Sequence, residues 1–167
     1  MPRLMQVLAF VVTLLGCVGC DQASKSVARE YLPRNEIVSF AGDVFRLQYA
    51  ENKGGFLSVG AALPDKVREL LFKVGVGAVV TAILCIVLFG PALPYATTIA
   101  LSLVAGGGLG NLIDRLVHDG HVVDFLNVGV GVLRTGIFNI ADVAVLVGAC
   151  MLVRSSLKRE EKTGFGP

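Results

Sequence analysis

The sequence contains no tryptophan and few charged residues. Charged side chains make up 17% of the 167 residues and hydrophobic ones 54%, against about 25% and about 45–50% in soluble domains. This composition excludes a disordered tail, a collagen and a small disulfide-bonded domain, and it argues against a soluble enzyme. The net charge is only +2, which provides no basic stripe, so we expect no nucleic-acid partner. The sequence therefore indicates a small integral membrane protein.

Three long stretches are almost free of charge. Positions 4–20 and 74–113 contain no charged residue, and 136–153 contains one, Asp142. A transmembrane helix needs about 20 apolar residues, so the stretch 74–113 is long enough for two helices, with a Gly- and Pro-rich turn at 90–94. We therefore predict a single, mainly α-helical membrane domain over 1–167. Its four transmembrane helices span about 4–20, 70–89, 95–113 and 138–154, its loops outside the membrane are 26–69 and 116–137, and its tail is 155–167.

Four spans place both termini on one side of the membrane and both long loops on the other. The polar residues that end or begin the spans then gather on the loop side, including Asp21, Lys25, Asn111 and Asn139. Basic residues in the tail favour a cytoplasmic C-terminus by the positive-inside rule. The loop 26–69 also carries six Lys or Arg residues, and the turn 90–94 carries none; both observations weigh against that orientation.

The two loops contain strand-like patterns. Positions 44–49 alternate, with Phe45, Leu47 and Tyr49 on one face and Arg46 and Gln48 on the other, which is the period of a β-strand. Residues 122–133 are also rich in β-branched side chains. We expect a small sheet that lies on the membrane surface.

Two aspartates are candidates for catalysis. Asp142 lies near the start of the fourth span, where a carboxylate is costly and therefore a functional candidate, and Asp124 lies between apolar residues on the same face. Two carboxylates that face one water can hydrolyse a peptide bond, because their repulsion raises one pKa and leaves an acid beside a base. The alternatives are that Asp142 caps its helix and that Asp124 is a turn residue.

Other polar residues have structural or competing interpretations. Asp114 and Arg115 end the third span, where an ion pair at the helix end is the simplest interpretation for Asp114, and the glycines of 106–110 favour close helix packing. His118 and His121 with their acidic neighbours match no metalloprotease pattern, so we expect no metal and no other cofactor. Two further functions remain open: a small membrane transporter or proton-conducting protein that uses Asp142, and a lipoprotein tethered through Cys17.

Several motifs together resemble the bacterial lipoprotein signal peptidase (signal peptidase II) family. They occur in the family's order and are Asp21-Gln22-Ala23-Ser24-Lys25, Asn52-Lys53-Gly54-Gly55-Phe56, the run from Gly106 to Arg115, Gly120-His121-Val122-Val123-Asp124-Phe125 and Phe138-Asn139-Ile140-Ala141-Asp142. The resemblance extends over about 4–154. The segment with Asn52 and Gly54 is one residue shorter than the usual motif of the family, so we expect this loop to contact the substrate differently.

The resemblance implies an aspartic endopeptidase of the bacterial inner membrane. Its four transmembrane helices would carry a small periplasmic β-cradle, with both termini cytoplasmic and the active site near the periplasmic face. Its substrates would be diacylglyceryl-modified prolipoproteins, cut N-terminal to the lipidated cysteine, and it would be a monomer that binds globomycin-type inhibitors. The catalytic pair of the family falls on Asp124 and Asp142. The residues that bind substrate or support the site fall on Asp21, Lys25, Asn52, Gly54, Asn111, Arg115 and Asn139.

Overall fold

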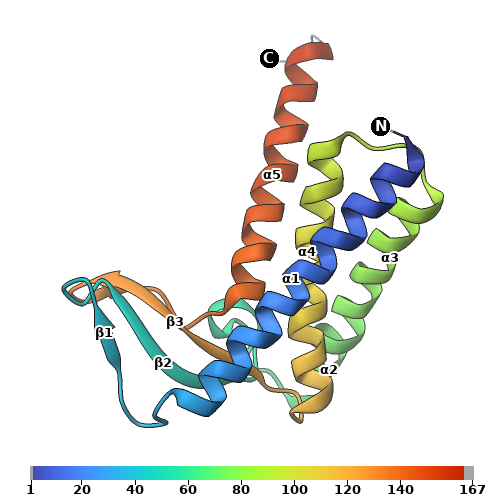
Figure 1. Ribbon diagram of the computed structural model, residues 1–167. Coiled ribbons are helices and arrows are strands. Elements are labelled where there is room, and N and C mark those ends of the chain that lie inside the picture. The colour runs from blue at the N-terminus through green and yellow to red at the C-terminus, as the bar shows by residue number, and fades with distance from the viewer. Residues whose placement is uncertain (1, 164–167) are drawn as a thin grey trace.

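The protein is a helical bundle with a small sheet at one end. A computed structural model describes residues 2–163 (Figure 1). Positions 164–167 of the predicted tail lie outside the described residues. The elements in chain order are α1 (Arg3–Tyr31), β1 (Val38–Phe40), β2 (Phe45–Asn52), η1 (Phe56–Ser58), α2 (Asp65–Glu69), η2 (Leu70–Gly75), α3 (Val76–Phe89), α4 (Tyr95–Val117), β3 (Val122–Val130), β4 (Leu133–Arg134) and α5 (Ile140–Thr163).

Within residues 2–163, four helical segments are long and apolar enough to cross a membrane. They are Arg3–Tyr31, Asp65–Phe89, Tyr95–Val117 and Ile140–Lys158, and the second of them combines α2, η2 and α3. Many of their large apolar side chains are exposed, such as Leu15 and Phe89, which is expected of helices whose outer surface contacts lipid. The predicted fold class, a mainly α-helical membrane protein with a small sheet, is confirmed.

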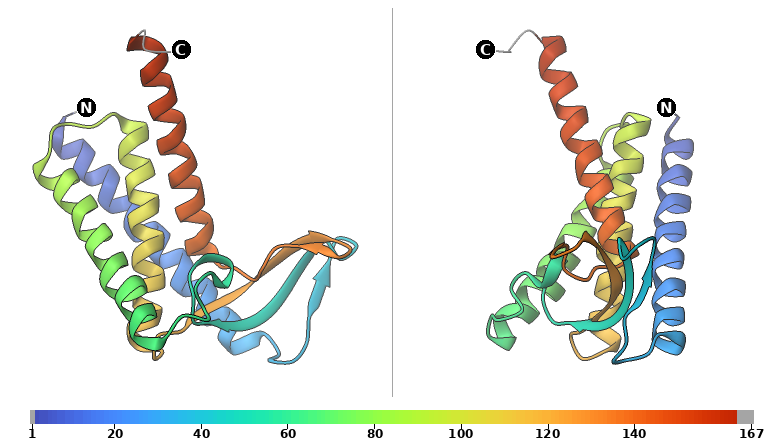
Figure 2. Two further views of the ribbon diagram at one scale, coloured as in Figure 1. Left: turned by 180° about the vertical axis from the view of Figure 1, so that it is seen from behind. Right: turned by 90° about the vertical axis from the view of Figure 1, so that its left-hand side faces the viewer.

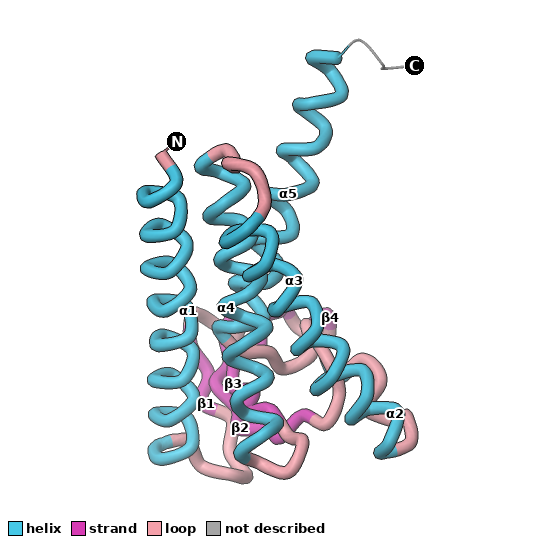
Figure 3. The backbone as a smooth tube through the Cα atoms, turned by 90° about the vertical axis from the view of Figure 1, so that its right-hand side faces the viewer, coloured by secondary structure: helices cyan, strands magenta, loops and turns pink. Residues whose placement is uncertain are grey.

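The helix α4 packs against α1, α3 and α5 (Figure 3). A buried apolar cluster of Phe10, Leu14, Ile83, Val87 and Ala105 joins α1, α3 and α4. The start of α1 and the last turns of α5 lie at one end of the bundle, and the sheet lies at the other end (Figure 2). This end of the bundle collects the polar residues that the sequence placed on the loop side.

The sheet has the order β1-β2-β3-β4 and is antiparallel throughout. The predicted strands at 44–49 and within 122–133 are confirmed as β2, β3 and β4. A second apolar cluster, formed by Ala28, Tyr49, Val123 and Phe125, packs the sheet against the last turns of α1. Because β3 follows α4 directly and leads on to α5, it carries its side chains beside the ends of both helices.

Candidate active site

The side chains of Asp124 and Asp142 are both buried at the junction between the sheet and the bundle. Asp124 lies on β3 and is 1% exposed, and Asp142 lies in the first turn of α5 and is 7% exposed. Backbone hydrogen bonds from Phe125 and Leu126 to the carbonyl of Phe138 connect β3 with the segment that leads into α5. The two carboxylates, which are 18 positions apart in the sequence, are therefore brought to one place.

The start of α5 is a reciprocal cap. The side-chain oxygen of Asn139 accepts a hydrogen bond from the backbone N–H of Asp142 (2.9 Å), and an oxygen of Asp142 accepts one from the backbone N–H of Asn139 (3.1 Å). This pattern satisfies two amides that a helix start otherwise leaves without partners. Asp142 thus caps its helix, as one alternative expected, and the cap also fixes the orientation of its carboxylate.

Asn139 binds both carboxylates at once. Its side-chain Nδ2 donates to Oδ1 of Asp124 (2.7 Å), while its backbone N–H donates to Oδ2 of Asp142. The remaining oxygens are held separately, because Asn52 Nδ2 donates to Asp124 Oδ2 (2.8 Å) and Asn111 Nδ2 donates to Asp142 Oδ1 (2.9 Å). Each carboxylate is therefore oriented by two donors, and one residue connects the pair.

A buried ion cluster lies directly behind the pair. Lys25 is 0% exposed; its ammonium contacts Asp21 (2.8 Å) and Asp114 (3.2 Å) and donates to Oδ1 of Asn111 (2.8 Å). The interpretation of Asp114 as half of a helix-end ion pair at the interface is wrong, since Asp114 is 0% exposed and binds Lys25 of another helix. Through Asn111, the cluster reaches the carboxylate of Asp142.

The two acidic members of this cluster also bind the backbone next to the candidate pair. Asp114 accepts from the N–H of Val123 (3.1 Å), one residue before Asp124, and Asp21 accepts from the N–H of Ala141 (3.0 Å), one residue before Asp142. The cluster therefore positions β3 and α5 relative to α1 and α4. This role of Asp114 was missed at the sequence level, because it depends on contacts between distant segments.

Gln22 was also missed. Its side-chain amide lies within hydrogen-bonding distance of Asp21, the carbonyl of Gly110 and Asp114. A Cβ at Gly110 would lie 2.5 Å from Oδ2 of Asp21, and one at Gly107 would lie 2.3 Å from the carbonyl oxygen of Ala141. The glycine-rich stretch of α4 thus lets α1 and α5 approach closely enough to form the cluster, and the predicted close packing is confirmed.

Arg115 connects the site to the loop that follows β2. Its guanidinium donates to the carbonyl of Gly54 (2.6 Å) and to that of Asn111 (3.2 Å), and it lies over the ring of Phe72. The backbone N–H of Gly54 donates to Asn52 Oδ1 (2.7 Å). A Cβ at Gly54 would lie 2.6 Å from the carbonyl oxygen of Val59, which explains why the turn requires glycine there.

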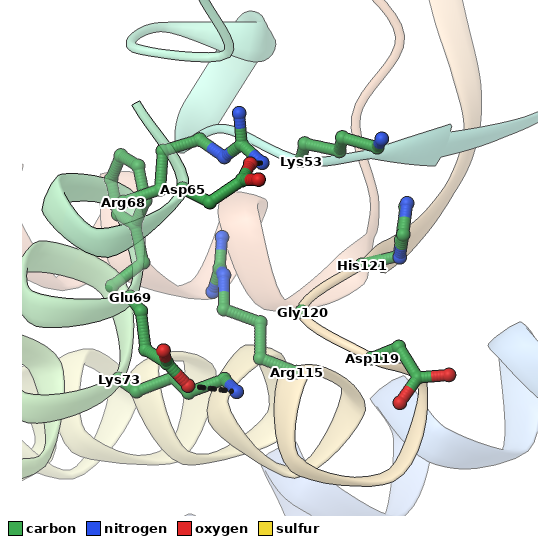
Figure 4. A pocket seen from close by; sticks show the side chains of 10 residues that line it. Lys53, Asp65, Arg68, Glu69, Lys73, Arg115, Asp119, Gly120 and His121 are labelled. Carbon is green, nitrogen blue, oxygen red and sulfur yellow. Dashed lines mark hydrogen bonds and ion pairs between the residues drawn. The ribbon is translucent and has the colours of Figure 1, made fainter. Parts of the chain in front are cut away.

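Two cavities meet at Arg115 and Phe72. The larger one, of about 720 Å³, is lined mainly by apolar residues of the 55–63 loop, η2, α3, α4 and α5, and Asn111, Arg115 and Asp142 also line it. The smaller one, of about 240 Å³, is polar. Its walls carry charges from α2, η2 and the turn at Gly120, and Arg115 points between them (Figure 4). The proposed pair therefore lies next to an apolar groove that joins a polar pocket.

The charges of the site favour one protonated carboxylate. The pKa of Asp124 is raised to about 7, mainly by burial and then by the nearby charge of Asp142, while the hydrogen bonds from Asn52 and Asn139 oppose this rise. The buried groups of the junction comprise four aspartates, Asp21, Asp114, Asp124 and Asp142, but only two cations, Lys25 and Arg115. A proton on Asp124 reduces this excess of negative charge, so near neutral pH the site can offer a carboxylic acid beside a carboxylate.

All nine residues singled out from the sequence belong to this junction. Asp21, Lys25, Asn111 and Asn139 bind one another or the pair directly, Asn52 holds Asp124, and Gly54 and Arg115 bind each other. The structure thus brings together every member of the predicted site.

Comparison with known proteins gives a consistent result. The family model described as signal peptidase (SPase) II matches residues 13–158. A lipoprotein signal peptidase of Burkholderia cenocepacia (strain HI2424) is 37% identical over 145 residues, which cover 83% of this chain and 81% of the relative. A lipoprotein signal peptidase of Borrelia hermsii is 33% identical over 158 residues, 92% of each chain.

Two solved structures share the fold. Both are bacterial membrane enzymes determined by the in meso method, at 2.3 Å and 1.9 Å resolution. The first has a TM-score of 0.77 at 22% identity and covers 98% of this chain and 93% of its own. The second has a TM-score of 0.72 at 23% identity and covers 92% and 93%.

Proposed function

The chain belongs to the signal peptidase II family, and from this premise we propose that it is an aspartic endopeptidase that works inside the membrane with Asp124 and Asp142 as its catalytic pair. It is a multi-pass bacterial membrane protein that removes signal peptides from lipoproteins. The observation that supports the proposed chemistry most strongly is that Asn139 holds both carboxylates at the end of the apolar groove. Family membership favours this function over the transporter and over a lipoprotein tethered through Cys17.

The apolar groove suits a lipid-modified, helical signal peptide. Its wall of α3 and α5 side chains matches the apolar surface of such a peptide, and Asp142 lies among the residues that line it. The substrate is a prolipoprotein that carries diacylglycerol on its cysteine, and the bond N-terminal to that cysteine lies at the pair. The polar pocket beyond Arg115 suits the hydrophilic chain that follows the cut.

The reaction needs one water and one proton on the pair at rest. Asp142 accepts a proton from the water as its oxygen attacks the scissile carbonyl carbon, and Asp124 donates its proton to the carbonyl oxygen. When the tetrahedral gem-diol intermediate collapses, the C–N bond breaks and Asp142 gives its proton to the leaving nitrogen. One hydroxyl of the diol returns a proton to Asp124 as the new carboxyl group forms, which restores the starting state of the pair. The apolar surroundings strengthen each of these electrostatic interactions.

The elements that carry the pair, β3 and the first turn of α5, lie on the side of the bundle where the sheet is, away from the start of α1 (Figure 2). The exposed Arg154 and Lys158 near the end of α5 support a cytoplasmic position for that end by the positive-inside rule. We therefore place both termini in the cytoplasm and the pair near the periplasmic face of the inner membrane.

A cleavage assay in proteoliposomes tests the catalytic pair. The variants Asp124→Asn and Asp142→Asn should each lower cleavage of a diacylglyceryl-modified precursor by at least about 100-fold, the usual contribution of a general acid or base. The exposed Glu36→Gln, on the loop before β1, is the matched control and should leave the rate unchanged. Globomycin should protect the precursor. Near-normal cleavage by either aspartate variant would refute the pairing.

A further inference from the structure

The tip of the sheet carries a patch of exposed apolar side chains. Val132 is 98% exposed, Leu133 80% and Val130 73%, while Phe45 is 53% and Phe40 50% exposed. These five residues, which we name the sheet tip, come from the turn between β1 and β2 and the turn between β3 and β4. Exposing such an apolar patch to water is unfavourable, so the patch indicates a contact with something apolar.

The two turns of the sheet tip form one fixed surface. Val130 pairs with Leu133 across a two-residue turn that begins with Gly131 at a φ of 55°, and Phe40 pairs with Phe45 across the other turn. Backbone and side-chain bonds join the turns, because Gly129 N–H donates to the carbonyl of Val44 (2.9 Å) and Arg134 donates to that of Asp43 (2.7 Å). The apolar side chains therefore project together.

The position of the sheet tip points to lipid. Two opposite views show the sheet leaving the bundle sideways and curving so that its tip lies level with the first turn of α5 (Figures 1 and 2). That turn begins a helix long and apolar enough to span the membrane. The tip thus stands beside the bundle at the level where the candidate membrane span of α5 begins.

The charges behind the sheet tip also fit a membrane surface. Arg46 binds Asp43 through two nitrogens (2.7 and 2.5 Å), and Arg134 approaches the same carboxylate (3.5 Å). Two guanidinium groups share one carboxylate, so this group of charges behind the sheet tip is positive overall. Positive side chains next to an exposed apolar edge suit the boundary between phosphate headgroups and acyl chains.

We propose that the sheet tip inserts into the acyl region of the adjacent leaflet, with Arg46 and Arg134 at the level of the lipid phosphates. The occupant of this surface is therefore lipid. The insertion holds the far end of β3, whose near end carries Asp124. It fixes the sheet against the same bilayer that α5 crosses, and it depends only on the protein being a membrane protein, not on the proposed proteolysis.

The absence of tryptophan allows a direct test in the full-length chain. We would place a single reporter with Val132→Trp and reconstitute the protein in phosphatidylethanolamine and phosphatidylglycerol vesicles. Val132 is almost fully exposed, so the substitution should not disturb the fold. Glu36→Trp is the matched control, because Glu36 is exposed and lies outside the sheet tip, four positions before Phe40.

The Val132→Trp emission should shift to shorter wavelength than that of the control. It should be quenched by lipids brominated on their acyl chains several times more strongly than the control, and less by aqueous iodide. Equal quenching of the two reporters by iodide would overturn the proposal. A shift that appears only at high protein density, without quenching by brominated lipid, would indicate a second copy of the chain and would overturn it as well.

A second pair of variants separates insertion from local packing. The reporter Phe45→Trp should show the same lipid quenching, and adding Val132→Asp should reduce that quenching severalfold, because a carboxylate at the tip opposes insertion. Unchanged quenching in the double variant would contradict the proposal. These readouts do not require cleavage, so a failure here leaves the proposed peptidase activity untouched, and the reverse also holds.

Discussion

Replacing Asp124 by asparagine should stabilise the protein while it removes cleavage. Burial raises the pKa of Asp124 from 3.8 to about 7, so between these values the folded protein binds a proton that the unfolded chain releases. The wild type therefore loses stability as the pH rises from about 4 to about 7, and the loss is complete above that range. Three pH units correspond to about 4 kcal/mol, an upper limit for the gain on removing the charge.

The asparagine does not recover all of this energy. Both oxygens of Asp124 accept from amide nitrogens, those of Asn139 and Asn52, and an amide at this position offers only one acceptor oxygen. One unsatisfied donor costs about 1–3 kcal/mol, so we expect a net gain of about 1–3 kcal/mol at pH 8. Below pH 4 the gain disappears, because the wild-type carboxyl is then protonated in both states.

The assay is thermal unfolding of the purified protein in detergent between pH 4 and pH 8, with cleavage measured on the same samples. The melting temperature of the wild type should fall across this range more steeply than that of Asp124→Asn. If the two proteins show parallel pH profiles, the raised pKa is wrong. If Asp124→Asn still cleaves the precursor, the assignment of Asp124 as the general acid is wrong.

Two further predictions concern the surroundings of the pair. The variant Asp114→Ala leaves Lys25 with one buried carboxylate fewer, so unfolding experiments should show a loss of about 3–5 kcal/mol; a loss below about 1 kcal/mol would contradict the proposed positioning role. In Gly107→Ala the new Cβ would lie 2.3 Å from a backbone carbonyl of α5, so both melting temperature and cleavage should fall. Gly16→Ala, with nothing within 4 Å, is its control and should be neutral or stabilising by up to about 1 kcal/mol; equal effects of the two would refute the packing argument.

The overall fold could be predicted because a bilayer imposes simple rules. Charge-free stretches mark helices, and with four helices the ends of alternate spans must share a side. The same rule places Asp124 and Asp142 on one side of the membrane. The strand β2 was predictable from the alternation of Phe45, Leu47 and Tyr49. The catalytic roles of Asp124 and Asp142 stay predictions, which cleavage by their asparagine variants tests.

The details of the site depend on contacts that no local pattern encodes. The binding of Asp114 to Lys25 joins residues 89 positions apart on two helices, and either residue alone looks like an ordinary interfacial charge. The cap at Asn139 was within reach, because Asn followed three positions later by Asp at the start of an apolar stretch is a helix-start signal. That the same asparagine also binds Asp124 required the path of β3.

The buried cluster around Lys25 fixes the position of α1 along its own axis relative to α4 and α5. Smooth apolar helices can slide past one another in lipid at little cost, since one turn of leucines resembles the next. The bonds from Asp21 and Lys25 to α4 and α5 remove that freedom. An extra residue inserted between these two side chains would rotate one against the other by about 100° and break the cluster. The same insertion near position 12 would rotate Asp21 and Lys25 together away from α4. The number of residues between the first turn of α1 and Asp21 therefore determines whether the buried cluster can form.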